Sequence, residues 1–377
     1  MIREIYLDNA ATSFPKAEGV SDAMKAYLDT VGVNVGRGSY ARCMDSGMAV
    51  LSVREAVAAA FGCTDARRVI FTAGCTAALN MAINGFVREG DTVLISSMEH
   101  NAVIRPLTAR GCRLVRIPSD DDGCMRLDRL NADWDAVKLC VCTHASNVSG
   151  TIQSIAPLSE NLHAHGIPFV LDAAQSAGHL PIDMEALHLA ALCIPAHKGL
   201  RGPQGLGLLL LSEAFAASLS PTVFGGTGSV SHSDRMPRFL PDRFEPGTLN
   251  LPGVYGLGAA MRAYDPIAVR RHETALTERF LAGLQGVPQL RILGPLEPEK
   301  RVGVVSVDFA SIDNAEASAL LDSEYHILTR CGLHCAPEAH KTLGSYPQGA
   351  VRFSFSPATT VDEIDAAIRA VREIAAR

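Results

Sequence analysis

A lysine and an aspartate follow two separate apolar segments of this sequence. Lys198 comes shortly after Leu192–Pro195, and Asp172 ends the segment Pro168–Asp172. If both segments are strands of one parallel sheet, their carboxyl ends lie at the edge where α/β proteins bind ligands. A lysine buried there loses hydration, which lowers its pKa and suits it to Schiff-base chemistry, whereas a solvated loop lysine does neither. The aspartate can hold a protonated ligand nitrogen, or it can cap the next helix.

Two further segments have residue types suited to binding an anion or a planar ligand. Thr72–Ala78 is rich in small residues, so its backbone can approach an anion and the N–H groups of a following helix can donate to it. The alternative is a simple capping turn at Thr76. His100 precedes another expected helix, where its ring can stack on an aromatic ligand or cap the helix.

Alternating strand-like and helix-like segments occupy the first two-thirds of the chain. Expected strands are 68–72, 92–96, 113–117, 139–143, 168–172, 192–195 and 206–211, and expected helices are 16–30, 47–61, 76–88, 100–110 and 155–165. This alternation predicts an α/β fold in which helices cover a mostly parallel sheet. The Gly- and Ser-rich segment 220–233 interrupts it, and a loop of that length is typical of a functional segment.

The pattern changes near residue 252, where a second, smaller α+β unit begins. We expect one long helix over roughly 253–286, strands at 302–309 and 350–354, and helices at 314–323 and 361–376. The predicted division is a large ligand-binding domain over 14–252 and a small domain over 1–13 and 253–377.

Composition excludes several classes of protein. The 377 residues carry a formal net charge of −6 and no basic block, so we expect no nucleic-acid partner. The ten cysteines form no CxxC pair and no HExxH is present, so we expect no metal site. No apolar run is long enough for a membrane span, and without a secretion signal we expect a cytoplasmic protein with free thiols. The absence of GxGxxG makes a dehydrogenase a weaker α/β alternative.

Seven segments in order resemble the aminotransferase class V family of pyridoxal-phosphate enzymes, and within it the cysteine desulfurases and selenocysteine lyases. They are Tyr6–Thr12, Glu99–Asn101, Ser146–Gly150, Asp172–Gln175, His197-Lys198, Phe244–Thr248 and Arg330–Pro337. The resemblance spans nearly the whole chain. It implies a fold-type-I enzyme with pyridoxal 5′-phosphate (PLP) as cofactor.

The resemblance also implies a role for each matching residue. Lys198 would carry the cofactor as a Schiff base, Asp172 would meet its ring nitrogen, and His100 would stack on its ring. The remaining implied cofactor contacts are Gln175 and Asn147 at the ring oxygen, and Gly74, Cys75, Thr76 and His197 at the phosphate. Thr248 would reach the phosphate of the other subunit, which implies a homodimer. Arg352 would grip the substrate carboxylate, with Ala11, Asn147 and Arg330 also in the substrate site; the catalytic set would be Lys198, Cys335 and His100.

Three positions depart from the family pattern. Pro195 stands where a hydroxyl residue is common, Cys75 replaces a Thr or Ala, and Leu333 replaces a second histidine. The first two changes put the phosphate contacts at those positions in doubt, although a backbone N–H at Cys75 would still serve.

Cys335 decides which activity the resemblance implies. Its context, His334-Cys335-Ala336-Pro337, resembles the branch with a short, ordered catalytic loop. A sulfur-accepting cysteine attacks as the thiolate, which cations such as Arg330 or His334 would favour. We expect an L-cysteine desulfurase that yields alanine and a persulfide on Cys335, with an unidentified sulfur acceptor. The alternatives are a selenocysteine lyase acting on L-selenocysteine, a class V aminotransferase or lyase in which Cys335 is incidental, and a non-catalytic PLP-binding protein.

Overall fold

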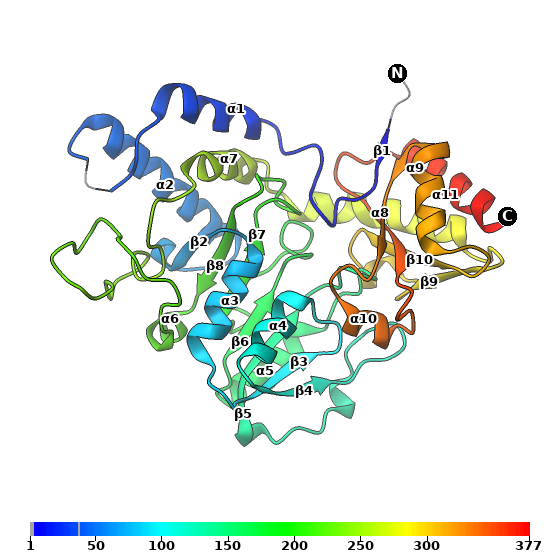
Figure 1. Cartoon of the computed structure of the whole chain (residues 1–377), viewed down its shortest axis with the longest axis horizontal. Helices are drawn as coiled ribbons and strands as arrows, with labels where there is room; N and C mark the ends of the chain where they lie inside the picture. Colours follow the sequence, from blue (N-terminus) through cyan, green and yellow to red (C-terminus); the bar gives the residue numbers. More distant parts are fainter. Residues whose placement is uncertain (1–3, 37) are drawn as a thin grey trace.

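A seven-stranded sheet lies at the centre of the larger part of the molecule (Figure 1). The computed structural model describes residues 4–36 and 38–377. In spatial order the strands are β2 (Val69–Thr72), β8 (Gly207–Leu211), β7 (Ala191–Pro195), β6 (Phe169–Asp172), β5 (Val137–Thr143), β3 (Thr92–Ser96) and β4 (Arg113–Ile117). Every neighbouring pair is parallel except the two that involve β8. The prediction of a mostly parallel α/β sheet is confirmed.

Strand register brings the chemistry-bearing segments to one edge of this sheet. Thr72 and Pro195, the last residues of β2 and β7, both lie opposite Gly207 at the start of β8. Asp172, the last residue of β6, lies opposite Cys193 of β7. The turns that follow β2, β6 and β7 therefore leave the sheet side by side.

Apolar side chains on both faces of the sheet fix its layers. Leu208 and Leu210 of β8 pack into one core, and Leu209 and Leu211 into the other. Helices α3 (Cys75–Phe86), α4 (Asn101–Ala109) and α6 (Glu213–Ser218) cover one face, and α2 (Ala41–Ala60), α5 (Ile155–Ala164) and α7 (Leu251–Arg262) cover the other. Because both faces are buried, strands β6, β7 and β8 at the middle of the sheet are almost continuously apolar, whereas the edge strand β4 keeps two exposed arginines, Arg113 and Arg116.

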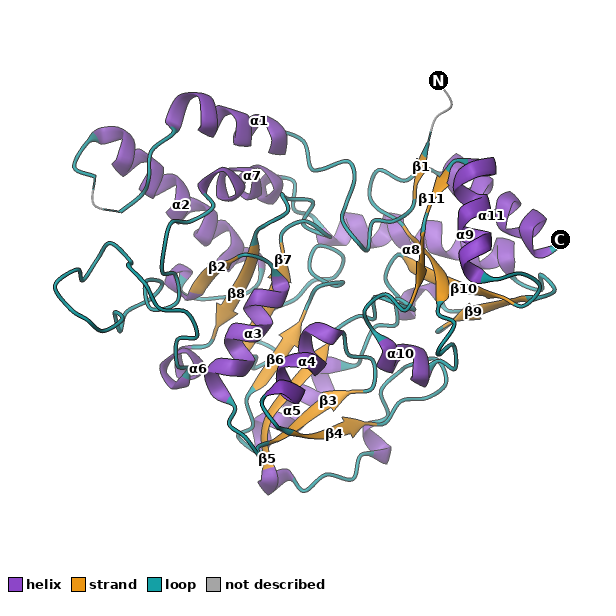
Figure 2. Ribbon diagram, in the orientation of Figure 1, coloured by secondary structure: helices purple, strands orange, loops and turns teal. Residues whose placement is uncertain are grey.

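The C-terminal part of the chain forms a separate four-stranded antiparallel sheet (Figure 2). Its order is β12 (Arg330–Gly332), β13 (Ala350–Ser354), β10 (Val304–Phe309) and β9 (Leu290–Leu293). Helices α8 (Pro266–Leu284), α9 (Asn314–Tyr325) and α11 (Val361–Ala375) share its apolar core. The N-terminal strand β1 (Ile5–Tyr6) pairs with β11 (Ile327–Leu328) beside it. The division at 14–252 stays a prediction.

The prediction of a single helix over 253–286 is wrong. Helix α7 ends at Arg262, and α8 starts afresh at Pro266 with Asp265 capping the N–H of Ala268 at 2.9 Å. Proline has no N–H to continue a helical ladder but suits the first turn of a new helix, so it separates the two. Near the N-terminus, helix α1 (Val20–Ala26) and a π-helical turn (Tyr27–Val31) replace the helix expected over 16–30. The short helix α10 (Pro337–Thr342) was not expected.

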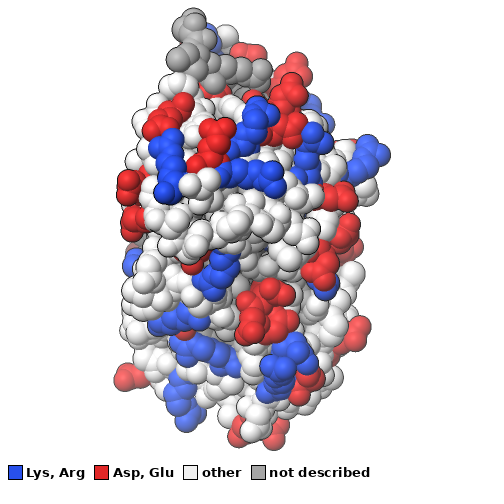
Figure 3. Space-filling model, turned by 90° about the vertical axis from the view of Figure 1, so that its right-hand side faces the viewer, with Lys and Arg blue, Asp and Glu red and all other residues white. Residues whose placement is uncertain are grey.

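Basic and acidic side chains are interleaved on the face that carries the C-terminal elements (Figure 3). Ion pairs such as Arg279–Asp365 and Arg377–Glu324 join neighbouring elements there. Such mixing produces no field of one sign that would steer a charged polymer to this face. Among the described residues no helix is long and apolar enough to cross a membrane, and no cluster of three potential metal ligands occurs.

Candidate active site

Lys198 lies at a cavity of about 490 Å³ at the carboxyl edge of the large sheet. The cavity is lined by Ala73, Gly74, Cys75, Thr76, Ala77, Asn80, Pro195, His197 and Lys198. Burial lowers the pKa of Lys198; among the smaller influences, Cys75, Asp172 and Cys335 raise it and Arg352 lowers it. A lysine in this environment is closer to the neutral amine that nucleophilic and base chemistry require.

The start of helix α3 forms an anion cradle on one wall of this cavity. Gly74 is the N-cap residue, with φ 147°, and no side chain caps the helix. The first N–H groups of a helix lack internal partners, so those of Cys75, Thr76 and Ala77 are free to donate to an anion. Gly207 permits the close approach of β8, because a Cβ there would lie 2.4 Å from the carbonyl carbon of Gly74.

His197 lies on the same cavity as the cradle. Burial, with smaller effects of Lys198 and Lys16, lowers the pKa of His197 to about 4, so its ring is neutral at physiological pH. Its Nδ1 lies 3.0 Å from Oγ1 of Thr12, and this contact leaves Nε2 as the nitrogen available to a ligand. Neutral His197 can therefore give one hydrogen bond but no charge to an anion here.

Asp172 is buried at the end of β6, with only 2% of its surface exposed. Its Oδ1 accepts from the N–H of Ala174 at 2.9 Å and from the thiol of Cys75 at 3.6 Å. The capping role considered from the sequence is therefore present. No hydrogen bond to Oδ2 is formed by the described residues, which leaves this oxygen for a ligand. Burial raises the pKa of Cys75 well above its usual value, so the neighbouring thiol adds no second negative charge.

His100 is a helix cap that lies close enough to Asp172 and Lys198 to interact with their charges. Its Nδ1 accepts from the N–H of Ala102 at 3.0 Å and thereby caps α4. Burial lowers the pKa of His100, and the charge of Asp172 partly opposes this effect. The cap fixes the plane of a neutral ring, as a stacking partner requires, so capping and stacking are compatible.

Two amides expected at the cofactor ring make contacts within the chain. Asn147 Nδ2 donates to the carbonyl oxygen of His334 at 2.7 Å, and Gln175 Nε2 donates to that of Ala10 at 3.0 Å. Each amide keeps a second N–H for a ligand. The structure thus ties Gln175 to the segment that contains Ala11, and Asn147 to the loop of Cys335.

Asp8 joins the two arginines expected at the substrate. It accepts from Arg330 Nη2 at 2.8 Å and from Arg352 Nη2 at 3.0 Å. Arg352, 3% exposed, also donates from Nη1 to the carbonyl oxygen of Asn147 at 3.0 Å. Its Nε is buried, and none of the described residues accepts a hydrogen bond from it. A buried donor of this kind is costly unless something accepts from it, which a substrate carboxylate would do.

Cys335 lies on a tight, exposed turn between β12 and α10. Both His334 (φ 50°) and Cys335 (φ 57°) are in the left-handed region, which is strained for residues other than glycine. Hydrogen bonds hold the turn on both sides, from Asn101 N to the carbonyl oxygen of Cys335 at 2.8 Å and from Asn147 to that of His334. The loop is thus anchored to the start of α4, next to His100, and to the turn that follows β5.

One expectation for this turn is wrong. His334 cannot act as a cation beside Cys335, because burial lowers its pKa to about 2 and keeps the ring neutral. Arg330 stays charged, since its bond to Asp8 raises its pKa. Cys331 is half-buried on β12, and burial raises its pKa, so this thiol is the less reactive of the two.

Comparison with known proteins assigns the chain to a family. The family model described as aminotransferase class-V matches residues 5–367. The chain belongs to this family. It is 31% identical over 382 residues to a probable cysteine desulfurase of Methanothermobacter thermautotrophicus, covering 98% of this chain and 94% of that protein. A cysteine desulfurase of Escherichia coli is 32% identical, with 98% and 93% covered. The solved structure of the apo cysteine desulfurase of Thermococcus onnurineus superposes with a TM-score of 0.92 at 30% identity, covering 99% and 95%.

Class V proteins use PLP, and this chain's residues fit that cofactor. The uncapped start of α3 suits a phosphate, and the free Oδ2 of Asp172 suits a protonated ring nitrogen. Lys198, with its lowered pKa, suits the aldehyde carbon. The individual residue roles remain predictions, as does that of Thr248, which lines a different cavity from Lys198.

Reasoning from the sequence missed three residues at this site. They are Asp8, which joins the two arginines, and Thr12 and Lys16, which contact His197. Asp8 and Thr12 lie within the quoted motif Tyr6–Thr12, so a signal was present, but nothing local predicts their partners. Lys16 had no signal, because its contact with His197 spans 181 residues of the sequence.

Proposed function

We propose that this chain is an L-cysteine desulfurase, which converts L-cysteine to alanine and leaves the sulfur as a persulfide on Cys335. The observation that carries the proposal is the placement of Cys335: an exposed thiol on a hydrogen-bonded turn, close enough to Lys198 to influence the pKa of that lysine. The cysteine desulfurases among its relatives support this assignment.

The substrate would be held by its carboxylate. Arg352 offers Nε, which has no partner among the described residues, while Asp8 and the carbonyl of Asn147 fix the guanidinium plane. Arg330, fixed by the same Asp8, adds positive charge at the mouth of the site. These contacts would select an amino acid over a simple thiol.

Proton transfer would be the task of Lys198. Once its Nζ is free, the lowered pKa lets it accept the Cα proton of the substrate. PLP, when bound, supplies the electron sink for the pair that this proton leaves behind. Asp172 would keep the ring nitrogen protonated, and His100 would hold the ring plane.

Sulfur transfer would be the task of Cys335. Its Sγ attacks the substrate Sγ, a new S–S bond forms, and the Cβ–S bond breaks. The electron pair of the broken bond stays on the carbon skeleton, which takes up a proton and becomes alanine. Carbon is thereby reduced and the transferred sulfur is oxidised, so no outside oxidant is needed.

The test is a product assay with L-cysteine on the PLP-loaded protein. We expect alanine in equal amount to persulfide, no keto acid, and a persulfide that maps to Cys335. Cys335→Ala should bind cofactor and cysteine yet release almost no alanine, whereas Cys331→Ala, the matched control, should retain most of the rate. Unaltered turnover in Cys335→Ala would refute the proposal, and keto acid as product would favour an aminotransferase. A parallel assay with L-selenocysteine separates the lyase alternative.

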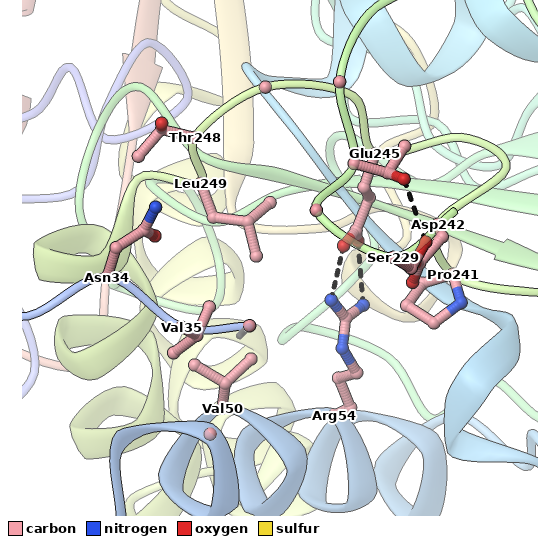
Figure 4. A pocket seen from close by; sticks show the side chains of 16 residues that line it. Asn34, Val35, Val50, Arg54, Ser229, Pro241, Asp242, Glu245, Thr248 and Leu249 are labelled. Atoms are coloured by element: carbon pink, nitrogen blue, oxygen red, sulfur yellow. Dashed lines mark hydrogen bonds and ion pairs between the residues drawn. The ribbon is translucent and has the colours of Figure 1, made fainter. Parts of the chain in front are cut away.

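A homodimer is part of the same proposal. Thr248 lines a cavity of about 800 Å³ together with Gly47, Val50 and Arg54 of α2 (Figure 4). Beside it, α2 and its N-cap expose a helical stripe of Tyr40, Met44, Met48 and Leu51, with 51%, 62%, 62% and 46% of their surfaces exposed. Exposed apolar groups at this spacing are typical of a helix that packs on a partner. A second copy would cover the stripe and receive Thr248 at its phosphate.

Sedimentation of the native protein and of Met48→Glu tests this dimer. We expect a stable dimer for the native chain and dissociation with loss of cofactor for the variant. A native monomer with full cofactor occupancy would refute it. The cytoplasmic location and the identity of the sulfur acceptor stay predictions from the sequence.

A further inference from the structure

Lys16 is a half-buried lysine with no acidic partner. Its Nζ donates to Thr12 Oγ1 at 3.0 Å, to the carbonyl oxygen of His197 at 3.2 Å and to Ser13 Oγ at 3.4 Å. Among the described residues no carboxylate forms an ion pair with it, and burial lowers its pKa to about 8. A cation enclosed without a counter-charge is costly, and an anion bound nearby would offset that cost.

The segment containing Lys16 is fastened along the turn that carries Lys198. Ser13 N donates to the carbonyl oxygen of His197 at 2.9 Å, and Ala17 N donates to that of Arg201 at 3.0 Å. Lys16 therefore lies against the backbone of His197, which lines the cofactor cavity, while Lys16 itself is not part of the lining.

Hydrogen-bond accounting around His197 indicates which of its nitrogens carries the proton. Its carbonyl oxygen has two lone pairs but four donors within 3.3 Å: N and Oγ of Ser13, Nζ of Lys16 and Oγ1 of Thr12. The Thr12 hydroxyl is the most distant of the four, and it already accepts a bond from Lys16. Its own proton is therefore best directed to His197 Nδ1, at 3.0 Å. We assign the ring proton to Nε2, the nitrogen left for the cavity.

The residues that line the cavity supply little positive charge for a bound anion. Among the described residues that line it, Lys198 is the only lysine or arginine, and this residue is expected to be consumed by the cofactor aldehyde. His197 is neutral, and Pro195 has no N–H to donate to a ligand in the cavity. A phosphate dianion at the start of α3 would thus lack a cation from its own chain unless one lies behind the lining residues.

We propose that Lys16 is a positioning residue for the phosphate group of the cofactor. It acts through Thr12, which sets His197 with Nε2–H toward the phosphate, and its ammonium charge offsets the phosphate charge. This inference rests on the cofactor site proposed above. It gives the cavity, where Pro195 has no donor, an oriented imidazole with a cation nearby.

Binding of two probes that differ only in the phosphate tests the role of Lys16. Pyridoxamine 5′-phosphate and pyridoxamine cannot react with Lys198, so calorimetric titration of the cofactor-free protein measures reversible binding. We expect Lys16→Met to weaken binding of the phosphorylated probe about tenfold, the lower end of the range found when an outer partner of a metal-binding histidine is removed. Binding of pyridoxamine should be unchanged. Thr12→Val should lose less affinity for the phosphorylated probe, and it too should bind pyridoxamine as the native protein does.

Conservative and control variants separate charge from packing. Lys16→Arg should restore most of the phosphate-dependent affinity, and Lys25→Met, which removes an exposed lysine, should change nothing. If Lys16→Met fails to fold, Lys16→Gln serves for the same comparison. The proposal would be overturned if Lys16→Met lost affinity equally for both probes or for neither of them. It would also be overturned if Lys16→Arg did not restore the affinity for the phosphorylated probe. If the native chain does not prefer the phosphorylated probe, the cofactor site itself is wrong, and the inference fails with it.

Discussion

A buried ion pair holds the Thr248 segment against helix α2, and breaking it offers a quantitative test of the fold. Arg54 Nη1 and Nη2 donate to the two carboxylate oxygens of Glu245 at 2.8 and 2.5 Å, with side-chain exposures of 6% and 5% (Figure 4). Glu245 also accepts from the N–H of Phe71 at 2.6 Å, and the guanidinium lies 4.3 Å from the centre of the Phe71 ring. The pair therefore fastens the segment of Glu245 to α2 and β2, whose contact residues lie 191 and 174 residues away from it in the sequence.

Glu245→Gln retains the shape of the side chain and removes its charge. Arg54 is then left as a buried cation whose remaining acceptors are neutral. Breaking one side of such a pair costs about 3–5 kcal/mol in free energy of unfolding. The loss should also displace Thr248, so cofactor affinity should fall with stability. Glu297→Gln, which breaks the exposed pair with Lys300, is the matched control and should leave the unfolding midpoint unchanged.

Urea unfolding of the cofactor-free protein measures these differences. The double variant Arg54→Met/Glu245→Leu replaces both charges by apolar side chains of similar length, so it should recover most of the stability lost in Glu245→Gln. The reasoning is refuted if Glu245→Gln unfolds within about 1 kcal/mol of the native protein, or if the double variant is less stable than the single one.

Three further predictions address the active site. Borohydride reduction of the PLP-loaded protein should attach the cofactor to Lys198, as peptide mapping would show; an adduct on another lysine would contradict the assignment. Asp172→Asn should keep bound cofactor, seen by absorbance, but lose most alanine production, since the ring nitrogen would no longer be held protonated; full activity would remove Asp172 from the mechanism. Burial raises the pKa of Glu99 to about 8, so the folded state holds a proton that the unfolded state loses near the ordinary value of 4.5. The stability from this proton is present at low pH and lost as pH rises to about 8, so the advantage of Glu99→Gln in urea midpoint should grow between pH 5 and pH 8. If the urea midpoint of Glu99→Gln exceeded that of the native protein by the same amount at every pH, Glu99 would not be a buried neutral acid.

The fold class was accessible from the sequence because it depends on local patterns. Seven short apolar segments separated by amphipathic ones imply a buried sheet between helices, and each expected strand overlaps an observed strand. The ends of those strands also indicated Lys198, Asp172 and the small residues before α3 as neighbours. Proline at 266 could have predicted the break between α7 and α8, but the continuous helical pattern on both sides masked it.

Only the tertiary structure decided which residues far apart in the chain contact each other. Asp8 meets Arg330 and Arg352 across more than 320 residues, and Lys16 meets His197 across 181. The neutrality of His334 likewise comes from burial, which depends on every element packed around it. Sequence by itself determined which residues have the chemistry and at which strand ends they lie, because residue type and periodicity are local properties. Which charges are paired, buried or left free depends on long-range packing, so only the folded chain decided the electrostatics of the site.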